Sequence, residues 1–295
     1  MQKTAFIAIV GCPNVGKSSI LNRMLGQKIA IVSNKPQTTR TRIMGVLTKD
    51  ETQLVFTDTP GFHRPKTKLG EKMVKAVSDS IGGVDACLMV VEGLSELQES
   101  EKELIEKFRK QKMPVVLAIN KIDLIENKEE LMVRISDMMQ EYNFEAVVPV
   151  SAAKNDGINE LLSELMNLAF PSEHFFPDDT LTDQPERVIA SEIIREKMLR
   201  LLDKEIPHGV AVSIEKMRER TNTDLMDVEA TIYCEKESHK GIIIGKQGAT
   251  LKRISTYARQ DMAKFFSCRI NLQCWVKVKE DWRNREGLIH NFGLD

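Results

Sequence analysis

The chain has 295 residues, 42% of them hydrophobic, and its 42 Lys and Arg residues against 43 Asp and Glu give a formal net charge of -1. This length favours two domains, and no apolar run reaches the roughly 20 residues that a membrane-spanning helix needs. Five cysteines without a Cys-x-x-Cys pair argue against a disulfide framework or a zinc site. The N-terminus, MQKTAFIAIVG, lacks the cleavage site of a signal peptide, so we expect a soluble protein of the cytoplasm.

The first 170 residues alternate strand-like runs with helical patterns. Apolar runs rich in β-branched residues predict strands at 6–10, 54–58, 86–92, 114–120 and 146–150. Apolar residues three and four positions apart predict helices at 95–111 and 157–169. Buried strands separated by helices indicate an α/β domain with a mostly parallel sheet flanked by helices. Such a sheet binds its ligands at the carboxyl ends of the strands.

The sequence GCPNVGKS at 11–18 matches the phosphate-binding pattern G-x-x-x-x-G-K-[ST], and it lies between a predicted strand and a helical pattern. Gly11 and Gly16 allow the backbone N–H groups to point at phosphate oxygens at the start of the helix. Lys17 is expected to reach the β- and γ-phosphates, and Ser18 to bind Mg²⁺. The residues expected to contact the nucleotide here are Gly11, Asn14, Val15, Gly16, Lys17, Ser18 and Ser19.

The sequence DTPG at 58–61 ends the predicted strand 54–58. The Asp58 carboxylate can hold Mg²⁺ through water, and the Gly61 N–H can reach the γ-phosphate. Taken alone, this tetrapeptide is equally compatible with an ordinary turn.

The sequences NKID at 120–123 and SAA at 151–153 each follow a predicted strand and can read a guanine base. The Asp123 carboxylate can accept hydrogen bonds from the guanine N1–H and exocyclic amine, and a site built for these bonds rejects adenine by about 10⁴-fold or more. A backbone N–H of the second segment can bond the guanine O6. Four such motifs, in this order and each at a strand end, indicate a guanine-nucleotide site. The residues expected at the base are Asn120, Lys121, Asp123, Ser151, Ala152 and Ala153.

The four motifs resemble those of translation-factor-class GTPases. The resemblance implies a switch I segment at 31–43, in which a threonine completes the Mg²⁺ coordination. We favour Thr39 over Thr38, although either threonine could simply be exposed on a loop. The implied metal ligands are therefore Ser18, Thr39 and Asp58, and the residues expected to act in hydrolysis are Lys17, Thr39 and Gly61.

Two positions bear on how hydrolysis would proceed. Phe62 stands where Ras-like GTPases have the glutamine that orients the attacking water, so we expect backbone groups to orient it and intrinsic hydrolysis to be slow. Asn14 occupies a position at which related GTPases bind a potassium ion in place of an arginine finger. The alternative, that Asn14 only stabilises the turn of the loop, stays open.

A linker is predicted where the periodic pattern stops. The segment FPSEHFFPDDTLTDQPE at 170–186 has three prolines and neither a helical nor a strand period. We expect a nucleotide-binding domain at 1–172, a linker at 173–186, a second domain at 187–280 and a tail at 281–295. The second domain is predicted to contain a helix at 188–203, strands near 210–219 and 226–235, helices on both sides of 245–248, and a strand at 269–278.

The sequence IIIGKQGATLKR contains a second glycine loop, GKQG at 245–248, but it lacks the preceding strand and the Lys-Ser/Thr pair of a nucleotide loop. It resembles the G-x-x-G loop of a KH domain, which approaches the backbone of single-stranded nucleic acid. The α-β-β-α-α-β order fits the type II form, and residues 236–279 carry ten Lys and Arg against two acidic residues. The preceding isoleucines are expected to line the groove for the bases. The residues expected to contact RNA are Ile244, Gly245, Lys246, Gln247, Gly248, Lys252 and Arg253.

Both domains together resemble the Era family of bacterial GTPases. The resemblance implies GTP/GDP and Mg²⁺ as ligands, binding to the 3′ end of 16S ribosomal RNA, and a role in assembly of the small (30S) ribosomal subunit and rRNA maturation. Members of this family are also found near the inner membrane, so peripheral membrane association is a possibility that the sequence leaves open, and we expect a monomer. Two alternatives stay open: an RNA chaperone or scaffold in which GTP hydrolysis is incidental, and a C-terminal domain that docks a protein instead of RNA.

Overall fold

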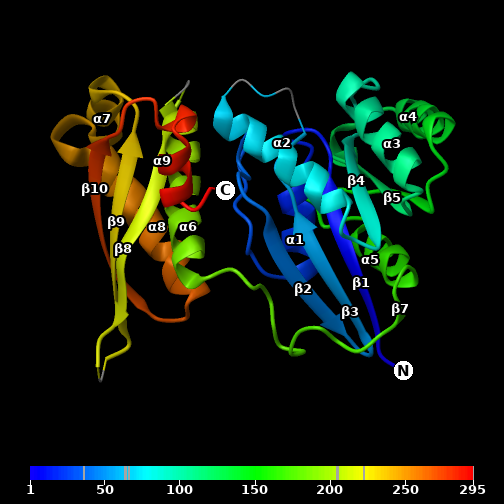
Figure 1. Ribbon diagram of the computed structural model, residues 1–295, viewed down its shortest axis with the longest axis horizontal. Helices are drawn as coiled ribbons and strands as arrows, with labels where there is room; N and C mark the ends of the chain where they lie inside the picture. The colour runs from blue at the N-terminus through cyan, green and yellow to red at the C-terminus, as the bar shows by residue number, and fades with distance from the viewer. Residues whose placement is uncertain (36, 63–64, 66, 204–205, 222, 295) are drawn as a thin grey trace. The chain divides into compact units, whose positions relative to one another are not determined.

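The computed structural model describes residues 1–35, 37–62, 65, 67–203, 206–221 and 223–294. The chain divides into two compact units, each described by itself below (Figure 1). The first unit comprises residues 1–30, 39–65 and 70–183, and the second comprises residues 31–38, 66–69 and 184–295. Pro36, within the predicted switch I segment, and His63, directly after Phe62, lie outside the described residues.

The first unit is built on a mostly parallel sheet with the strand order β2-β3-β1-β4-β5-β6. Its parallel strands are β1 (Lys3–Val10), β3 (Thr52–Asp58), β4 (Ala86–Glu92), β5 (Val115–Asn120) and β6 (Ala146–Pro149). Strand β2 (Ile43–Lys49) pairs antiparallel with β3 at the edge, and β7 (Phe170–Pro171) pairs antiparallel with β1. Strand β2 is absent from the predicted set: it begins at the last residue of the predicted switch I segment, and Gly45 interrupts its apolar run.

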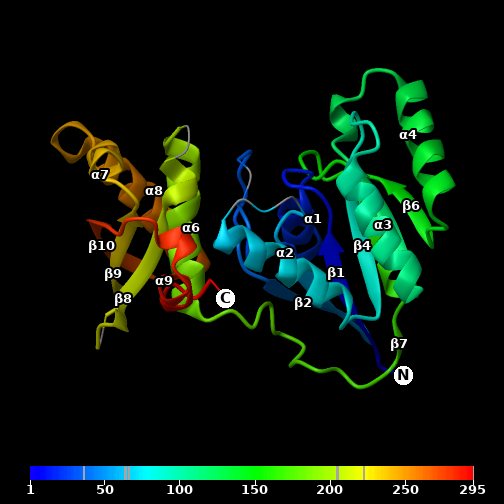
Figure 2. The same cartoon turned by 45° about the horizontal axis from the view of Figure 1, so that its top comes forward.

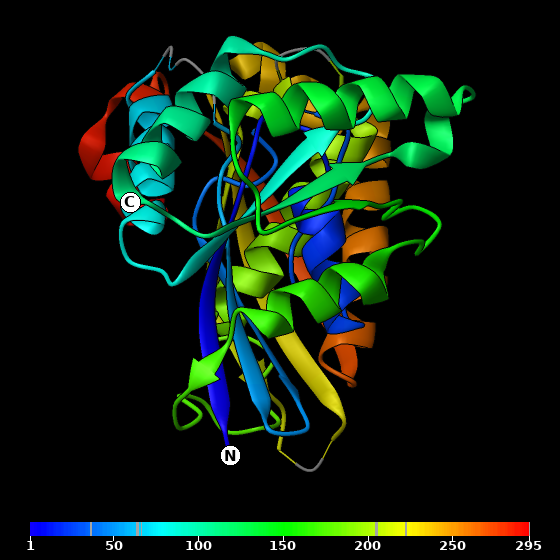
Figure 3. The same ribbon diagram turned by 90° about the vertical axis from the view of Figure 1, so that its right-hand side faces the viewer.

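Helices cover both faces of this sheet (Figures 1 and 2). Figure 3 shows blue α1 (Lys17–Leu25) and green α5 (Ile158–Asn167) on one side of the sheet and cyan α2 (Lys68–Ile81) on the other. Helices α3 (Glu99–Gln111) and α4 (Lys128–Glu141) share the face of α2. The core on that face joins residues of these helices to the strands and includes Val77, Leu104, Phe108, Met138 and Met89. This arrangement confirms the predicted α/β class.

The residues after β7 run along the edge of the same sheet. The Val46 N–H donates to the Leu181 carbonyl over 2.9 Å, and the Thr182 hydroxyl donates to the Met44 carbonyl over 2.6 Å. The Gln53 side-chain oxygen accepts hydrogen bonds from the N–H groups of residues 175 and 176. Most of the stretch predicted as a linker therefore packs onto the first unit.

The second unit has the α-β-β-α-α-β order of a type II KH domain. Its elements are α6 (Glu186–Leu201), β8 (Ala211–Glu219), β9 (Leu225–Cys234), α7 (Glu237–Ile244), α8 (Ala249–Phe265) and β10 (Arg269–Val278), joined by short 3-10 turns at Ile206–Gly209 and Lys246–Gly248. The strand order is β10-β9-β8, with β9 parallel to β10 and antiparallel to β8. Helices α6 and α8 pack on one face of this sheet through an apolar core (Figure 1).

The tail after β10 closes with a 3-10 turn, Trp282–Asn284, and helix α9 (Glu286–Asn291). The Trp282 indole is buried and donates to the Gly209 carbonyl over 2.9 Å. In the part of the chain that the structure describes, no helix is both long enough and apolar enough to cross a membrane.

Candidate functional site

The first glycine loop lies between β1 and α1 and has a backbone that only glycine accommodates at two positions. Gly11 and Gly16 have φ angles of +148° and +101°. A Cβ on Gly11 would lie 2.2 Å from the Val90 carbonyl oxygen, and one on Gly16 would lie 2.1 Å from the Asn120 amide nitrogen. Because Gly16 is the N-cap of α1 and has no capping side chain, the N–H groups of the first helical turn are available to an anion.

Lys17 is buried and its ammonium group lies against this loop. It donates to the carbonyls of Gly11 and Cys12 over 3.1 and 2.9 Å. Burial lowers the pKa of Lys17, and the nearby Asp58 carboxylate opposes that shift. The loop therefore holds a desolvated cation next to the N–H groups at the start of α1, which is an arrangement suited to a polyphosphate.

Three oxygen-bearing side chains that could bind a metal ion, those of Ser18, Thr39 and Asp58, meet beside Lys17. The register between β1 and β3 pairs Ile9 with Asp58, so Asp58 lies next to the loop that follows β1. The Ser18 hydroxyl is 2.6 Å from the Asp58 carboxylate and 3.0 Å from the Thr39 hydroxyl. The other carboxylate oxygen of Asp58 is buried and, among the described residues, has no hydrogen-bond partner. Burial raises the pKa of Asp58 to about 6, against the opposing effects of Lys17 and the Ser18 hydrogen bond.

This set of donors fits a magnesium ion. Mg²⁺ prefers hard oxygen ligands, and a cation would compensate the buried carboxylate oxygen of Asp58. The two candidate threonines differ in their contacts. The Thr39 hydroxyl contacts Ser18, whereas the Thr38 hydroxyl bonds the Ser33 hydroxyl over 2.7 Å and the Lys35 carbonyl over 2.6 Å.

Gly61 and Phe62 connect the DTPG segment to the first glycine loop. A Cβ on Gly61 would lie 2.6 Å from the Pro13 Cα, so the two backbones approach closely. The Phe62 N–H donates to the Gly11 carbonyl over 3.0 Å. The Phe62 ring is buried in the core beneath α2 and α3, with the Lys107 ammonium 4.4 Å from its centroid. The side chain at this position is therefore anchored in the core and carries no hydrogen-bonding group.

Asn120 braces the segments expected to bind the nucleotide. Its buried amide donates to the Val15 carbonyl over 2.8 Å, and its oxygen accepts from the Ala152 N–H over 3.1 Å. The Ser151 hydroxyl donates to the Asp123 carboxylate over 2.5 Å. The structure thus brings the NKID and SAA segments together next to the first glycine loop.

Two residues outside the sequence motifs, Arg23 and Glu92, contact this region. Arg23 on α1 donates to the carbonyls of Ala152 and Ala153 over 2.8 and 3.3 Å. The Glu92 carboxylate at the end of β4 lies 3.0 Å from the ammonium group of Lys121, a motif residue with a φ of 65°. Arg23 and Glu92 carry no local signature, because each is far in sequence from the segment that it contacts. Of the other motif positions, Asn14 is exposed with a φ of 66°, and Ser19 is half-buried.

The second glycine loop joins α7 to α8. Gly245 and Gly248 have φ angles of +74° and +78°, and a Cβ on Gly245 would lie 2.2 Å from the Thr250 hydroxyl oxygen. Between them, Gln247 also has a positive φ of 51°. The side chains of Lys246, Gln247, Lys252 and Arg253 are exposed on this loop and on the first turns of α8.

The structure corrects the expectation that all three isoleucines before this loop line a groove. Ile243 is fully buried in the core of the second unit, whereas Ile242 is exposed and Ile244 is half-buried. The three residues lie on one helix, α7, so their side chains point about 100° apart and cannot all face the same groove.

Comparison with known proteins identifies relatives of both units. A profile described as 50S ribosome-binding GTPase matches residues 6–121, and a KH domain profile matches residues 205–283. A protein named GTPase Era from Clostridioides difficile strain 630 is 50% identical over 295 residues, which cover 100% of this chain and 99% of the relative. GTPase Era from Ruminiclostridium cellulolyticum is 49% identical over 291 residues, covering 99% and 97% of the two chains.

Two solved structures match the whole chain. A variant of Aquifex aeolicus Era bound to GDP.AlF4- has a TM-score of 0.95 and 35% identity, with 99% of each chain covered. A structure of Era in complex with MgGDPNP and nucleotides 1506–1542 of 16S ribosomal RNA has a TM-score of 0.95 and 36% identity, with 100% of this chain and 99% of that chain covered.

Proposed function

Because this chain belongs to the Era family of GTPases, we propose that it is a GTP-driven switch that binds the 3′ end of 16S ribosomal RNA and acts in assembly of the small ribosomal subunit. GTP hydrolysis is the activity of the family, and the KH domain supplies the RNA-binding module. The RNA target is taken from the relative that was solved with nucleotides 1506–1542 of 16S ribosomal RNA.

The observation that carries the nucleotide part of this proposal is the meeting of Ser18, Thr39 and Asp58 beside Lys17. These three oxygen donors would hold Mg²⁺, which neutralises charge on the β- and γ-phosphate oxygens when it is bound. The N–H groups of the first glycine loop, Lys17 and the Gly61 N–H would orient the triphosphate. Their role in hydrolysis is therefore positioning and charge neutralisation, while water attacks the γ-phosphate.

Slow intrinsic hydrolysis follows from the position of Phe62. Since its ring is buried in the core and cannot hydrogen-bond a water molecule, backbone groups of the switch segments would have to orient the attacking water. A potassium ion bound near the exposed Asn14 would supply additional positive charge at the phosphates, as an arginine finger does in other GTPases.

Guanine selectivity is proposed to rest on Asp123. Its carboxylate is held by Ser151 and can accept hydrogen bonds from the base, while Asn120 and Lys121 fix the surrounding loops. Since the N–H groups of Ser151 and Ala152 donate to the Asp156 carbonyl and to the Asn120 side chain, the N–H of Ala153 is the candidate to bond the guanine O6.

The RNA part of the proposal rests on the second glycine loop. Positive φ angles at Gly245 and Gly248 and the exposed side chains of Lys246, Lys252 and Arg253 suit close approach to a phosphate backbone. Ile244 and Gln247 would contact the bases or sugars.

In-cell RNA crosslinking tests this target. We expect the wild-type chain to crosslink near the 3′ end of 16S ribosomal RNA, and the double variant Lys246→Asp, Gln247→Asp to lose these crosslinks because it places two negative charges at the phosphate backbone. A matched variant, Lys216→Asp, changes an exposed lysine on β8 and should keep them. Crosslinks that persist in the loop variant would contradict the KH assignment and favour protein docking.

We place the protein in the cytoplasm as a monomer, with any membrane association peripheral. The assembling small subunit is a cytoplasmic partner, which supports this location. Sedimentation of the purified chain tests the monomer, and flotation with anionic lipid vesicles tests the peripheral contact. A dimer, or recovery of all protein with the vesicles at physiological salt, would contradict this part of the proposal.

A further inference from the structure

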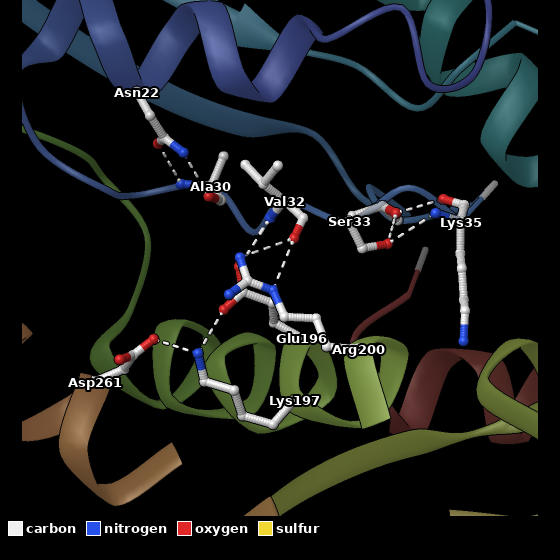
Figure 4. A network of polar contacts seen from close by, with 10 residues as sticks. Asn22, Ala30, Val32, Ser33, Lys35, Glu196, Lys197, Arg200 and Asp261 are labelled. Atoms are coloured by element: carbon white, nitrogen blue, oxygen red, sulfur yellow. Dashed lines mark hydrogen bonds and ion pairs between the residues drawn. The ribbon is translucent and has the colours of Figure 1, made fainter. Parts of the chain in front are cut away.

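Part of the predicted switch I segment belongs to the second compact unit. The described residues of 31–38 are grouped with this unit, and Figure 4 shows the contacts of Val32 with Glu196 and Arg200 of α6. The Val32 N–H donates to the Glu196 carboxylate over 3.1 Å, and the Val32 carbonyl accepts from the Arg200 guanidinium over 3.3 Å. The Arg195 guanidinium donates to the Thr38 carbonyl. The backbone of this segment is therefore hydrogen-bonded at both ends to charged side chains of α6.

Glu196 is the centre of this network. Its carboxylate is fully buried and accepts from the Val32 N–H, from Arg200 over 3.0 Å and from Lys197 over 2.8 Å. A buried carboxylate needs such partners, because leaving it unpaired in a low-dielectric environment is costly. The Val32 N–H is thus one of the groups that compensate the buried charge of Glu196. Loss of this hydrogen bond would therefore cost more than loss of a surface ion pair.

Lys197 extends the network to α8, the helix that follows the second glycine loop. Its ammonium group bonds both Glu196 and Asp261, and Asp261 lies on α8 (Figure 4). Helix α8 begins directly after Gly248, the last residue of the second glycine loop. A continuous series of hydrogen-bonded groups therefore runs from switch I through α6 to the helix that carries the loop.

We propose that Glu196 is a positioning residue that couples the nucleotide-dependent state of switch I to RNA binding, with Lys197 and Asp261 as the link to α8. This inference rests on the proposed function, since it needs both a nucleotide site and an RNA site. Neighbouring residues carry the coupling: the Thr38 carbonyl is held by Arg195 of α6, while the Thr39 hydroxyl lies 3.0 Å from Ser18 in the first unit. Because Thr38 and Thr39 share a peptide bond, a displacement of Thr39 between nucleotide states would pass to Thr38 and to its contact with Arg195.

A thermodynamic cycle on the full-length chain tests the inference. The probe is RNA of nucleotides 1506–1542 of 16S ribosomal RNA, and its Kd is measured with saturating Mg·GDPNP and with saturating Mg·GDP. We expect the two Kd values of the wild type to differ by about 5-fold or more, and those of Glu196→Gln and Asp261→Asn to differ by less than about 2-fold. Because coupling is reciprocal, RNA should shift the Kd for GDPNP relative to that for GDP by the same factor in each variant.

Controls separate coupling from general damage. Glu229→Gln makes the same chemical change at an exposed ion pair on β9 and should keep the wild-type ratio. Asp261→Glu retains the carboxylate, so this variant should also keep most of the wild-type ratio of the two Kd values. Since Glu196 is fully buried and Glu196→Gln can destabilise the unit, its melting temperature is measured first. If that variant is unfolded, the partly exposed Asp261→Asn decides the question.

The outcomes distinguish the two levels of the proposal. A wild-type ratio of about 1 would overturn the GTP-driven switch, and the coupling role of Glu196 with it. A wild-type ratio of about 5 or more that both variants retain would overturn only the role of Glu196. Loss of the ratio in Glu196→Gln but not in Asp261→Asn would overturn the link to α8.

Discussion

Replacing Asn120 by alanine tests whether this side chain braces the nucleotide site. The change removes the amide from a buried position, where it bonds the Val15 carbonyl over 2.8 Å and the Ala152 N–H over 3.1 Å. Each backbone group left without a partner costs about 1–3 kcal/mol, so the free energy of unfolding should fall by about 2–6 kcal/mol. Because both the first glycine loop and the SAA segment lose their brace, the affinity for GDP should fall by about tenfold or more.

Urea unfolding of the nucleotide-free protein measures the first effect, and titration with a fluorescent GDP analogue measures the second. The matched control is Asn127→Ala, which removes an exposed N-cap of α4 that accepts from the Glu129 N–H over 3.0 Å. The control should cost about 1 kcal/mol and leave GDP affinity unchanged. The reasoning is refuted if Asn120→Ala costs no more than the control and binds GDP as tightly as the wild type.

Three further outcomes are expected. Asp123→Asn should shift the preference from guanine towards xanthine nucleotides, because it replaces an acceptor by a donor; a competition assay in which GTP still wins would show that another group reads the base. Hydrolysis should be faster in potassium than in sodium buffer at equal ionic strength, and Asn14→Ala should remove that difference; equal wild-type rates would exclude the potassium site. Hydrogen bonds from Arg220 and Asn271 lower the pKa of Asp227 to about 2, so its stabilising contribution is present above its usual pKa and is lost as the pH falls towards 2. Acid unfolding should therefore show Asp227→Asn less stable than the wild type at neutral pH, with the difference shrinking below pH ~4; a difference independent of pH would contradict this.

Much of the first unit follows from local sequence. The central strands are continuous apolar runs, and Gly11–Ser18 lies at the end of one of them, so both the sheet and the first glycine loop can be predicted without knowledge of the tertiary structure. The parallel arrangement then explains why Asp58 lies beside this loop, since the carboxyl ends of parallel strands meet at one edge of the sheet.

The contacts that support the site are not predictable in the same way. Asn120 bonds Val15 across 105 residues, and Glu196 bonds Val32 across 164 residues. Such pairings depend on how the elements pack, and no local pattern distinguishes Glu196 from an exposed glutamate on a helix. The burial of Ile243, in contrast, is predictable from local sequence, because it follows from the position of this residue on α7 once the helix is assigned.

The affinity of the wild-type chain for RNA in its two nucleotide states tests the central claim most directly. Binding of RNA with nucleotides 1506–1542 of 16S ribosomal RNA should be tighter with Mg·GDPNP than with Mg·GDP by about 5-fold or more. Equal affinities would contradict a GTP-driven switch and favour an RNA scaffold in which hydrolysis is incidental.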